Sequence, residues 1–318
     1  MAVDAATFLT YSAIGNREDL SNIIYNIDPT ETPFISGIKK VKSAAVTHEW
    51  QTQALNAASS TNSVLEGDDA TTDTSTPTVR LGNILQIQDK VARVSGTQRQ
   101  VEHAGRDDEL DYQVMLRGKE LKRDMETTAL ANQGKNAGAP GTPRALGAVL
   151  SWIYSNTSKG TNGSDPSSAG LGASTRTDGT MRAFTEAQLK TVLQSAWNNG
   201  GEPDTIMVGG FNKQQFSTFT GRSTPMEEAK SKKIVATVDV YESDFGQLKV
   251  VANRFQRARD VLVLQMDMWK KSTLPGRDMV SVPLAKTGDS DRKQILTEWT
   301  IEAGNEKANA GVFDVTSA

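Results

Sequence analysis

The stretch Asp107 to Gln133, DDELDYQVMLRGKELKRDMETTALANQ, carries the strongest helix pattern in the chain. Four apolar residues recur in it at spacings of 4, 7 and 4, which places them on one side of an α-helix: Leu110, Val114, Leu121 and Met125. Asp107 and Asp108 complement the positive end of the helix dipole, and Gly134 offers a left-handed stop. We predict a helix of about 25 residues, roughly 40 Å long, that serves as a spine.

The first 45 residues have the composition of an extended arm. Apolar residues at helical spacing predict one short helix over residues 17–27. Pro29 and Pro33 then stop it, because proline lacks an N–H donor and pushes the preceding residue toward extended geometry. Phe34 begins an apolar tag that needs a surface to lie against. Two interpretations stay open, an arm that packs on its own domain and an arm that packs on a neighbouring subunit.

Residues 45–100 have the pattern of a long two-stranded excursion. Residues 46–53 alternate with a period of two, and residues 84–94 return with β-branched side chains. Between them, residues 56–77 are almost all small and polar and include no lysine or arginine. Such a segment buries too little apolar surface to offset the entropy of ordering it, so we expect a protrusion that a partner holds.

Glu66, Asp68 and Asp69 form an acidic cluster in this protrusion. Three interpretations remain open for it: a solvated loop tip, a contact with a basic surface on another subunit, and a calcium site. Calcium takes six to eight oxygen ligands, and this cluster lacks the glycine and the distal glutamate of an EF-hand loop.

The second half of the chain has the pattern of an α/β unit that follows a polar loop. Residues 155–180 are rich in Ser, Thr, Gly and Asn, which predicts a flexible surface loop, and the apolar run 145–154 before it fits either a strand or a helix. Thr185 and Gln188 form a capping box, and we expect a helix with Trp197 on its inner face that ends at Gly200. The later pattern predicts a helix over 212–219 and strands over 205–208, 234–241, 248–251, 261–264 and 295–303.

The composition excludes several classes of protein. The 318 residues include 35 Lys+Arg, 38 Asp+Glu, two His and no Cys, for a net charge of −3. No thiol chemistry is available, and we expect His48 and His103 to be structural. No phosphate-binding loop, serine nucleophile elbow or zinc-protease motif is present. A near-neutral, slightly acidic chain disfavours sequence-independent binding to nucleic acid. We therefore predict no enzyme, no cofactor and no metal site.

No stretch of the sequence is apolar for long enough to cross a bilayer, which needs about 20 residues. The N-terminus also lacks the basic start and continuous apolar run of a signal peptide. We expect no contact with a membrane.

Four blocks along the chain resemble one family of proteins. They are DPTETPFI at 28–35, QIQDKVARVSGTQ at 86–98, KELKRDME at 119–126 and GEPDTIMVG at 201–209. In their order and spacing they resemble the major capsid proteins of tailed bacteriophages, which have the Hong Kong 97-type (HK97-like) fold. The resemblance implies an α+β fold made of an N-terminal arm, an extended hairpin called the E-loop, a peripheral domain and an axial domain.

Carried onto this chain, the resemblance assigns each segment a part. Residues 1–45 would be the N-terminal arm and residues 46–105 the E-loop. Residues 106–182 would form the peripheral domain with the spine helix and the flexible loop, and residues 183–255 the axial domain. Residues 256–318 would supply late strands that complete both domains.

The same resemblance implies a function and partners. The chain would be a major capsid protein that assembles through hexamers and pentamers into an icosahedral virion shell around double-stranded DNA, without sequence-specific binding. A separate scaffolding protein is implied because no long helical segment precedes the arm, together with a portal protein and a possible decoration protein. Assembly would take place in the cytoplasm of the bacterial host. The alternatives are an encapsulin-type compartment shell and, from another class, a soluble enzyme or binding module.

A shell protein functions through contacts between its copies. The candidates for such contacts are Pro29, Pro33, Phe34, Glu66, Asp68, Asp69, Lys119, Lys122 and Arg123. We hypothesise that the acidic cluster meets a basic patch on the spine helix of a neighbour. Some relatives crosslink the E-loop through a lysine, whereas residues 51–89 contain none, so we expect the shell to cohere without covalent links.

Overall fold

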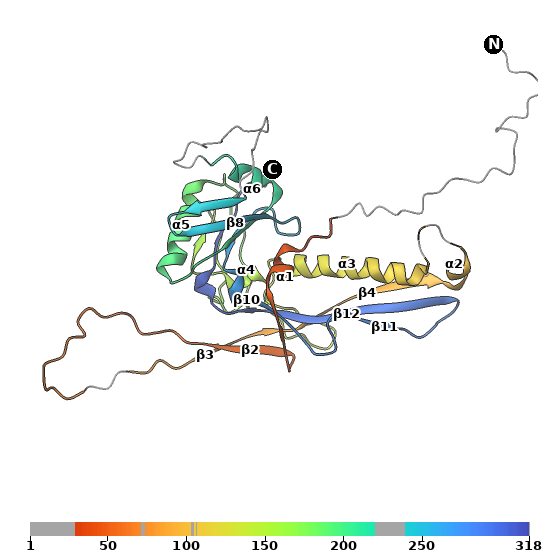
Figure 1. The fold of residues 1–318 in the computed structure, drawn as a ribbon, viewed down its shortest axis with the longest axis horizontal. Coiled ribbons are helices and arrows are strands. Elements are labelled where there is room, and N and C mark those ends of the chain that lie inside the picture. The colour runs from red at the N-terminus through yellow and green to blue at the C-terminus, as the bar shows by residue number, and fades with distance from the viewer. Residues whose placement is uncertain (1–28, 71–73, 103–104, 106, 220–238, 318) are drawn as a thin grey trace, which may run out of the picture.

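The computed structural model describes residues 29–70, 74–102, 105, 107–219 and 239–317. It mixes helices and strands, and Figure 1 shows three parts: an elongated sheet under a long helix, a rounded unit beside it, and a projecting hairpin. The expected α+β class is confirmed. The predicted helix over residues 17–27, and His103, lie outside the described residues.

The elongated part is a five-stranded sheet built around its longest strand. Its members are β1 (Lys39–Lys42), β4 (Gln86–Ser95), β10 (Trp269–Thr273), β11 (Val280–Pro283) and β12 (Ser290–Ala303). Strand β12 pairs antiparallel with β4 along one side and with β10 and β11 along the other, while β1 runs parallel to β10. The spine helix α3 (Glu109–Ala129) lies along β4 and β12 (Figure 1).

The rounded part is a six-stranded sheet with two helices. Its strand order is β5 (Thr157–Ser158), β13 (Ala310–Val312), β9 (Val261–Leu264), β6 (Thr205–Val208), β8 (Gly246–Ala252) and β7 (Val240–Ser243). Helices α5 (Glu186–Asn198) and α6 (Gly210–Phe216) pack on it through a shared apolar cluster. The segments after residue 256 therefore supply strands to both sheets.

The projecting hairpin pairs β2 (Thr47–Thr52) with β3 (Val79–Ile84). Alternate residues of β2 are half-buried, as the period of two predicts. The strand expected over residues 84–94 is present as β4, but its expected place in the hairpin is wrong, because β4 pairs with β12 in the elongated sheet and the hairpin returns through β3. Figure 1 shows the hairpin leading away from the molecule at the junction of its two larger parts.

The spine helix confirms the pattern that predicts it. Leu110, Leu121 and Met125 are buried, and Asp108 caps the first turn by accepting a hydrogen bond from the Leu110 N–H at 2.7 Å. The helix ends at Ala129, however, five residues before the expected stop at Gly134. Gly134 does not adopt the left-handed conformation; a Cβ there would lie 2.6 Å from the Ala173 carbonyl oxygen, so close packing explains this glycine.

Three other expectations need correction. The run 145–154 contains one helical turn, α4 (Val149–Trp152), with extended flanks, because its backbone instead bonds to neighbouring segments. Trp197 is 56% exposed and stacks on Phe245, since the inner face of α5 is filled by smaller apolar residues. Strand β7 runs on to Ser243 and β8 begins at Gly246, so the turn between them is tighter than the strands expected over 234–241 and 248–251 imply; residues 234–238 of the first of these lie outside the described part of the chain.

The segment 155–180 is irregular, as expected, but it is not a free surface loop. The Asn156 side chain is buried and donates to the carbonyls of Lys307 and Asn309. Arg176 is 3% exposed and lies 3.5 Å above the ring of Phe313. Short polar residues favour irregular backbone here because their side chains hydrogen-bond to neighbouring backbone groups.

The core runs through all these parts. One apolar cluster joins the helix of the arm, α1 (Pro33–Gly37), to α3, α4 and both sheets. At its centre the Glu126 carboxylate accepts hydrogen bonds from the N–H groups of Phe34 and Ile35, each at 2.8 Å, and from Asn253 at 2.6 Å. Burial raises the pKa of Glu126, and these three hydrogen bonds oppose that rise.

We predict that Glu126→Ala lowers the free energy of unfolding by about 3 kcal/mol, because three buried donors lose their acceptor. Chemical denaturation followed by tryptophan fluorescence measures this change, and limited proteolysis should show earlier cleavage near residue 33. The matched control is Glu120→Ala on the same helix, where the carboxylate pairs only with Arg117 at the surface. Equal stability of the two variants would contradict the role given to Glu126.

Candidate assembly surfaces

The candidate residues of the arm divide between the core and the surface. Phe34 is completely buried within its own subunit, and its ring meets Trp269 edge-on at 6.0 Å. The expectation that its side chain contacts a neighbour is therefore wrong, because it presents no surface. Pro29 and Pro33 are half-buried. The arm between residues 29 and 45 packs on its own subunit, the first of the two interpretations left open.

One buried amide attaches the hairpin to the rest of the subunit. The Asn83 side chain, on β3, is fully buried. Its Nδ2 donates to the carbonyls of Gly147 at 3.0 Å and Ile301 at 2.8 Å, and its Oδ1 accepts from the Gly147 N–H at 2.7 Å. The amide therefore joins the hairpin to the segment before α4 and to β12, and it sets the direction in which the hairpin leaves.

Aromatic and charged contacts surround this attachment. The ring of Trp50 on β2 lies 5.4 Å from the ring of Trp152. His48 contacts the Glu302 carboxylate at 3.0 Å, and Lys270 donates to the same carboxylate at 2.7 Å. The hydrogen bond with His48, with that from Lys270, lowers the pKa of Glu302 despite its burial. This environment fits the structural role expected for His48.

Lys135 lies on the same attachment. Its Nζ donates to the Gly82 carbonyl at 2.6 Å and sits 5.5 Å from the Trp152 ring. Burial lowers the pKa of Lys135. The attachment of the hairpin thus combines amide, ionic and aromatic contacts, which the short β2–β3 pair could not supply alone.

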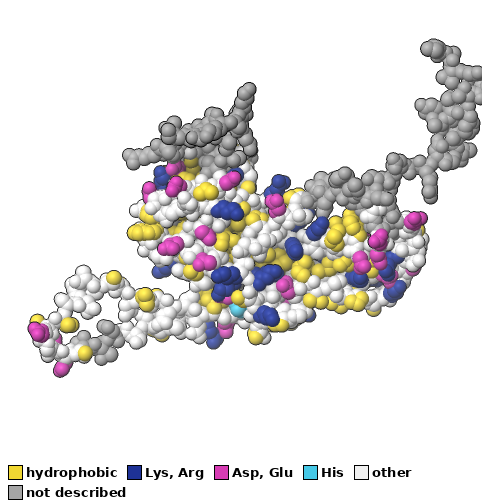
Figure 2. Space-filling model, viewed as in Figure 1, with side chains coloured by type: hydrophobic (Ala, Val, Ile, Leu, Met, Phe, Trp, Pro, Cys, Tyr) yellow, Lys and Arg dark blue, Asp and Glu magenta, His cyan; other side chains and the backbone are white. Residues whose placement is uncertain are grey.

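The tip of the hairpin carries the acidic cluster. Glu66, Asp68 and Asp69 are all exposed, and a turn at Gly67 brings the Asp68 N–H within 3.2 Å of the Leu65 carbonyl. Neighbouring apolar side chains are also exposed, with Val64 at 82% and Leu65 at 77%. Figure 2 shows acidic side chains at the far end of the hairpin and basic ones over the middle of the molecule. The tip thus presents apolar and acidic groups together.

The candidate basic residues lie along α3. Lys119 is half-buried, Lys122 is exposed, and the guanidinium of Arg123 lies 5.5 Å from the ring of Phe255. Within one subunit helix α3, which carries them, lies away from the hairpin tip, which projects from the other end of the molecule (Figure 1). Any contact between the two groups must therefore join different copies.

A second group of lysines extends this basic surface. The strands β1 and β10 place Lys39 opposite Lys270 and Lys40 opposite Lys271, and like charges in such positions repel. Lys270 pairs with Glu302 and Lys271 with Asp278. Lys39, Lys40 and Lys42 are exposed and have no ion pair among the described residues. Lys39, Lys40 and Lys42 are not among the residues predicted from the sequence, although the motif KKVK at 39–42 could have indicated them.

Lys40 and Lys122 line the same hollow between the arm and the spine helix. Its volume is about 440 Å³, and Thr32, Ile35 and Met125 contribute to its walls. The hollow is also lined by Lys271 and by the carboxylates of Glu31 and Asp278, so apolar side chains and an excess of lysines over carboxylates meet there. This mixture partly complements the apolar and acidic groups at the hairpin tip.

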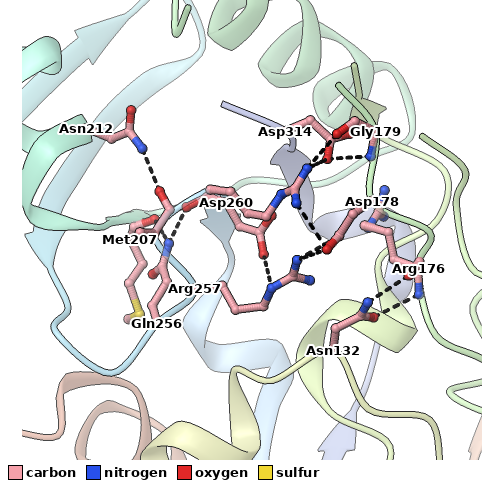
Figure 3. A network of polar contacts seen from close by, with 12 residues as sticks. Asn132, Arg176, Asp178, Gly179, Met207, Asn212, Gln256, Arg257, Asp260 and Asp314 are labelled. Carbon is pink, nitrogen blue, oxygen red and sulfur yellow. Dashed lines mark hydrogen bonds and ion pairs between the residues drawn. The ribbon is translucent and has the colours of Figure 1, made fainter. Parts of the chain in front are cut away.

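A network of arginines and aspartates holds the 155–182 loop against the six-stranded sheet (Figure 3). Arg257 donates to both carboxylate oxygens of Asp178 at 2.6 Å. Asp314 accepts hydrogen bonds from the N–H groups of Gly160 and Gly179 and from Arg259. A segment with almost no apolar side chains is thus tied down by charge and hydrogen bonding.

The described residues contain no cluster of three or more His, Asp or Glu side chains that could hold a metal ion. In that part of the chain no helix is both long and apolar enough to cross a membrane. What the arrangement offers is a set of surfaces for protein contacts: an acidic and apolar projection, a basic hollow and a firmly anchored arm.

Comparison with known proteins identifies relatives over almost the whole chain. The family model of the SU10 major capsid protein matches residues 5–316. The major capsid protein of Escherichia phage Phieco32 is 26% identical over 344 aligned residues, which cover 96% of each chain.

Solved structures share the fold at low identity. The capsid protein of a native GTA particle superposes with a TM-score of 0.66 at 10% identity and covers 96% of this chain and 98% of its own. That of cyanophage A-1(L) gives 0.62 at 12% identity, with 97% and 98% covered. The SrpI encapsulin of Synechococcus elongatus PCC 7942 gives 0.55 at 11% identity, with 95% and 93% covered.

We predict that Asn83→Ala lowers the free energy of unfolding by about 2 to 3 kcal/mol, since the Gly147 and Ile301 groups would be left buried without a partner. Thermal and chemical unfolding measure the loss. The control is Asn56→Ala, because the Asn56 amide bonds only to exposed groups within the hairpin. If both variants unfold at the same denaturant concentration, Asn83 does not anchor the hairpin.

Proposed function

The chain belongs to the SU10 major capsid protein family, and from that membership we propose that the shell it builds encloses packaged double-stranded DNA. It is a structural protein of a phage virion with the HK97-like fold, and it self-assembles into capsid shells. The observation that carries the proposal is the family match over residues 5–316, supported by capsid structures that share the fold along nearly all of the chain.

The encapsulin-type compartment is the less favoured alternative. The SrpI encapsulin shares the fold, but its TM-score of 0.55 is below the 0.66 of the GTA capsid, and the family match is to a phage protein. Near-neutral charge also suits a wall around DNA, because a strongly basic lining would hold the genome tightly. We propose that the wall encloses DNA without sequence-specific binding and has no enzymatic activity.

We propose that assembly takes place in the host cytoplasm through hexamers and pentamers, with a separate scaffolding protein. Weak contacts between identical subunits permit several curvatures, so a second protein that selects one curvature would direct closure. A portal protein and a decoration protein would complete the particle. With no lysine in residues 51–89, we propose that cohesion is non-covalent.

Within the shell, we propose that the hairpin tip of one subunit contacts the basic surface of another. Glu66, Asp68 and Asp69 lie on a segment without a positive charge from residue 51 to residue 79. Lys119, Lys122 and Arg123 on α3 form the expected receiving surface, and the β1 lysines widen it. Half-buried ion pairs of this kind contribute specificity and speed of association more than raw affinity. Pro29 and Pro33 are half-buried, and we propose that the surface they leave exposed contacts a neighbour.

We expect the chain expressed alone to give polyhedra, tubes or free capsomers in negative-stain electron microscopy, and closed shells of one size when its neighbouring genes are present. The assemblies should dissociate to single monomers in boiling detergent, because no covalent links join them. Discrete small oligomers that turn over a substrate would overturn the proposal.

We predict that Asp68→Lys/Asp69→Lys reduces shell yield at least tenfold by placing like charges against the basic surface. Adding Lys119→Glu/Lys122→Glu should restore part of the yield. Sucrose-gradient sedimentation quantifies both results. The control is Glu202→Lys/Asp267→Lys, which makes the same change of charge at exposed positions away from the tip. Shells of the first variant that form and resist heat like the wild type would show that these charges do not meet.

A further inference from the structure

Asp260 is a buried carboxylate with no hydrogen-bond donor. It precedes β9, and its side chain is 1% exposed. Neither of its carboxylate oxygens accepts a hydrogen bond from a described residue. Buried polar groups are normally hydrogen-bonded, and a buried charge without a partner is costly. The group is therefore poised between a neutral form that tolerates burial and a charged form that needs a donor.

Charged groups from three segments surround Asp260 (Figure 3). Arg257 and Arg259 lie on the same turn, Arg176 and Asp178 lie on the 155–182 loop, and Asp314 follows β13. The arginines donate their hydrogen bonds to groups other than the Asp260 carboxylate. Arg176 donates to Asp165 and the Ile153 carbonyl. Arg259 donates to Asp314 and the Gly179 carbonyl, and its Nη1 lies 3.2 Å from Asp178, which makes it a second and longer contact of that carboxylate beside Arg257.

Arg257 is the cation placed between two carboxylates. Its Nη2 donates to both oxygens of Asp178 at 2.6 Å, whereas its Nε stands 3.5 Å from an oxygen of Asp260. Its Nη1 is buried and has no hydrogen-bond acceptor among the residues that the structure describes. A small rotation of this guanidinium would give Asp260 a donor at the expense of Asp178. The two carboxylates therefore compete for one side chain.

We propose that Asp260 is a pH-sensitive switch that governs how firmly Arg257 holds the 155–182 loop. When Asp260 is protonated, Arg257 stays with Asp178 and the loop is held against the six-stranded sheet. When Asp260 is ionised, it draws Arg257 toward itself and weakens the bond to Asp178. The inference concerns the subunit itself and does not depend on the proposed function.

The direction of the switch follows from the burial of Asp260. Burial raises the pKa of Asp260 to about 6 from 3.8, while Arg257 and Arg176 oppose the rise. A carboxyl whose pKa is raised by folding stabilises the fold below its unfolded pKa, and this stabilisation is lost as pH rises through the folded pKa. The loop should thus be held firmly near pH 5 and loosely above pH 7.

The loop carries surface that such a change would affect. Leu171 and Met181 are each about half exposed, at 48% and 49%. The Gly160 and Gly179 N–H groups that bond to Asp314 report on the same attachment. Loosening at neutral pH would therefore alter an apolar part of the subunit surface.

Hydrogen–deuterium exchange of the full-length subunit at pH 5.0 and pH 7.5, corrected for the intrinsic effect of pH, tests the switch. We expect peptides covering 160–182 to lose at least fivefold in protection at pH 7.5. In Asp260→Asn the protection should be equal at the two pH values within twofold. In Asp178→Asn, where Arg257 has no carboxylate on the loop to hold, protection should be low at both.

The control Asp244→Asn, on the exposed turn between β7 and β8, should keep the wild-type difference. The proposal is overturned if the wild-type peptides are equally protected at both pH values, or if Asp260→Asn retains the wild-type difference. If Asp260→Asn does not fold, the Asp178→Asn variant decides, since full protection at pH 5.0 without Asp178 would exclude the switch.

Discussion

The rest of the structure depends on the hydrogen bonds of the buried Glu126 carboxylate, which join the arm, the spine helix and the rounded unit. Glu126 lies on the spine helix. Its carboxylate accepts hydrogen bonds from two N–H groups in the first turn of the arm helix and from the side chain of Asn253 beside the six-stranded sheet. Thr32, at the cap position of the arm helix, makes no capping bond of its own, so Glu126 satisfies that turn from a distance. Desolvating the carboxylate costs free energy, which these three charge-assisted bonds offset only with this geometry. That requirement fixes the arm, the spine and the rounded unit relative to one another.

Buried polar side chains also hold irregular backbone to the core at three other places. Asn83 bonds to the backbone where the hairpin leaves, Asn156 does so at the start of the 155–182 loop, and Asp314 does so at its end. Apolar burial is not directional, whereas each of these side chains is satisfied in one arrangement only. A shell subunit needs both non-directional apolar burial and directional hydrogen bonds. Its projecting parts must leave the core in defined directions before a neighbour covers them.

The regular elements could be predicted from local pattern. The apolar stripe of α3 and the capping box of α5, in which the Thr185 N–H donates to Gln188 at 3.3 Å, both appear where expected. Most of the errors share one cause, because they involve a partner distant in the chain. Residues 84–94 pair with β12 about two hundred residues later, and the aromatic neighbour of Trp197 is Phe245. A polar composition likewise could not show that the carboxylates and arginines around Asp314 are buried together.

By itself, the sequence determined the most regular elements, among them α3, α5, β6 and β9, together with the absence of familiar catalytic motifs and the resemblance that led to the family. These properties follow from periodicity and composition over short spans, which the backbone period of each element converts into a buried and an exposed face. Only the tertiary structure decided that Phe34 belongs to the core, that Lys40 and Lys122 line one hollow, and that Asp260 is buried without a donor among the described residues. Burial and electrostatic environment depend on segments brought together by folding, and no local pattern records which segments will meet.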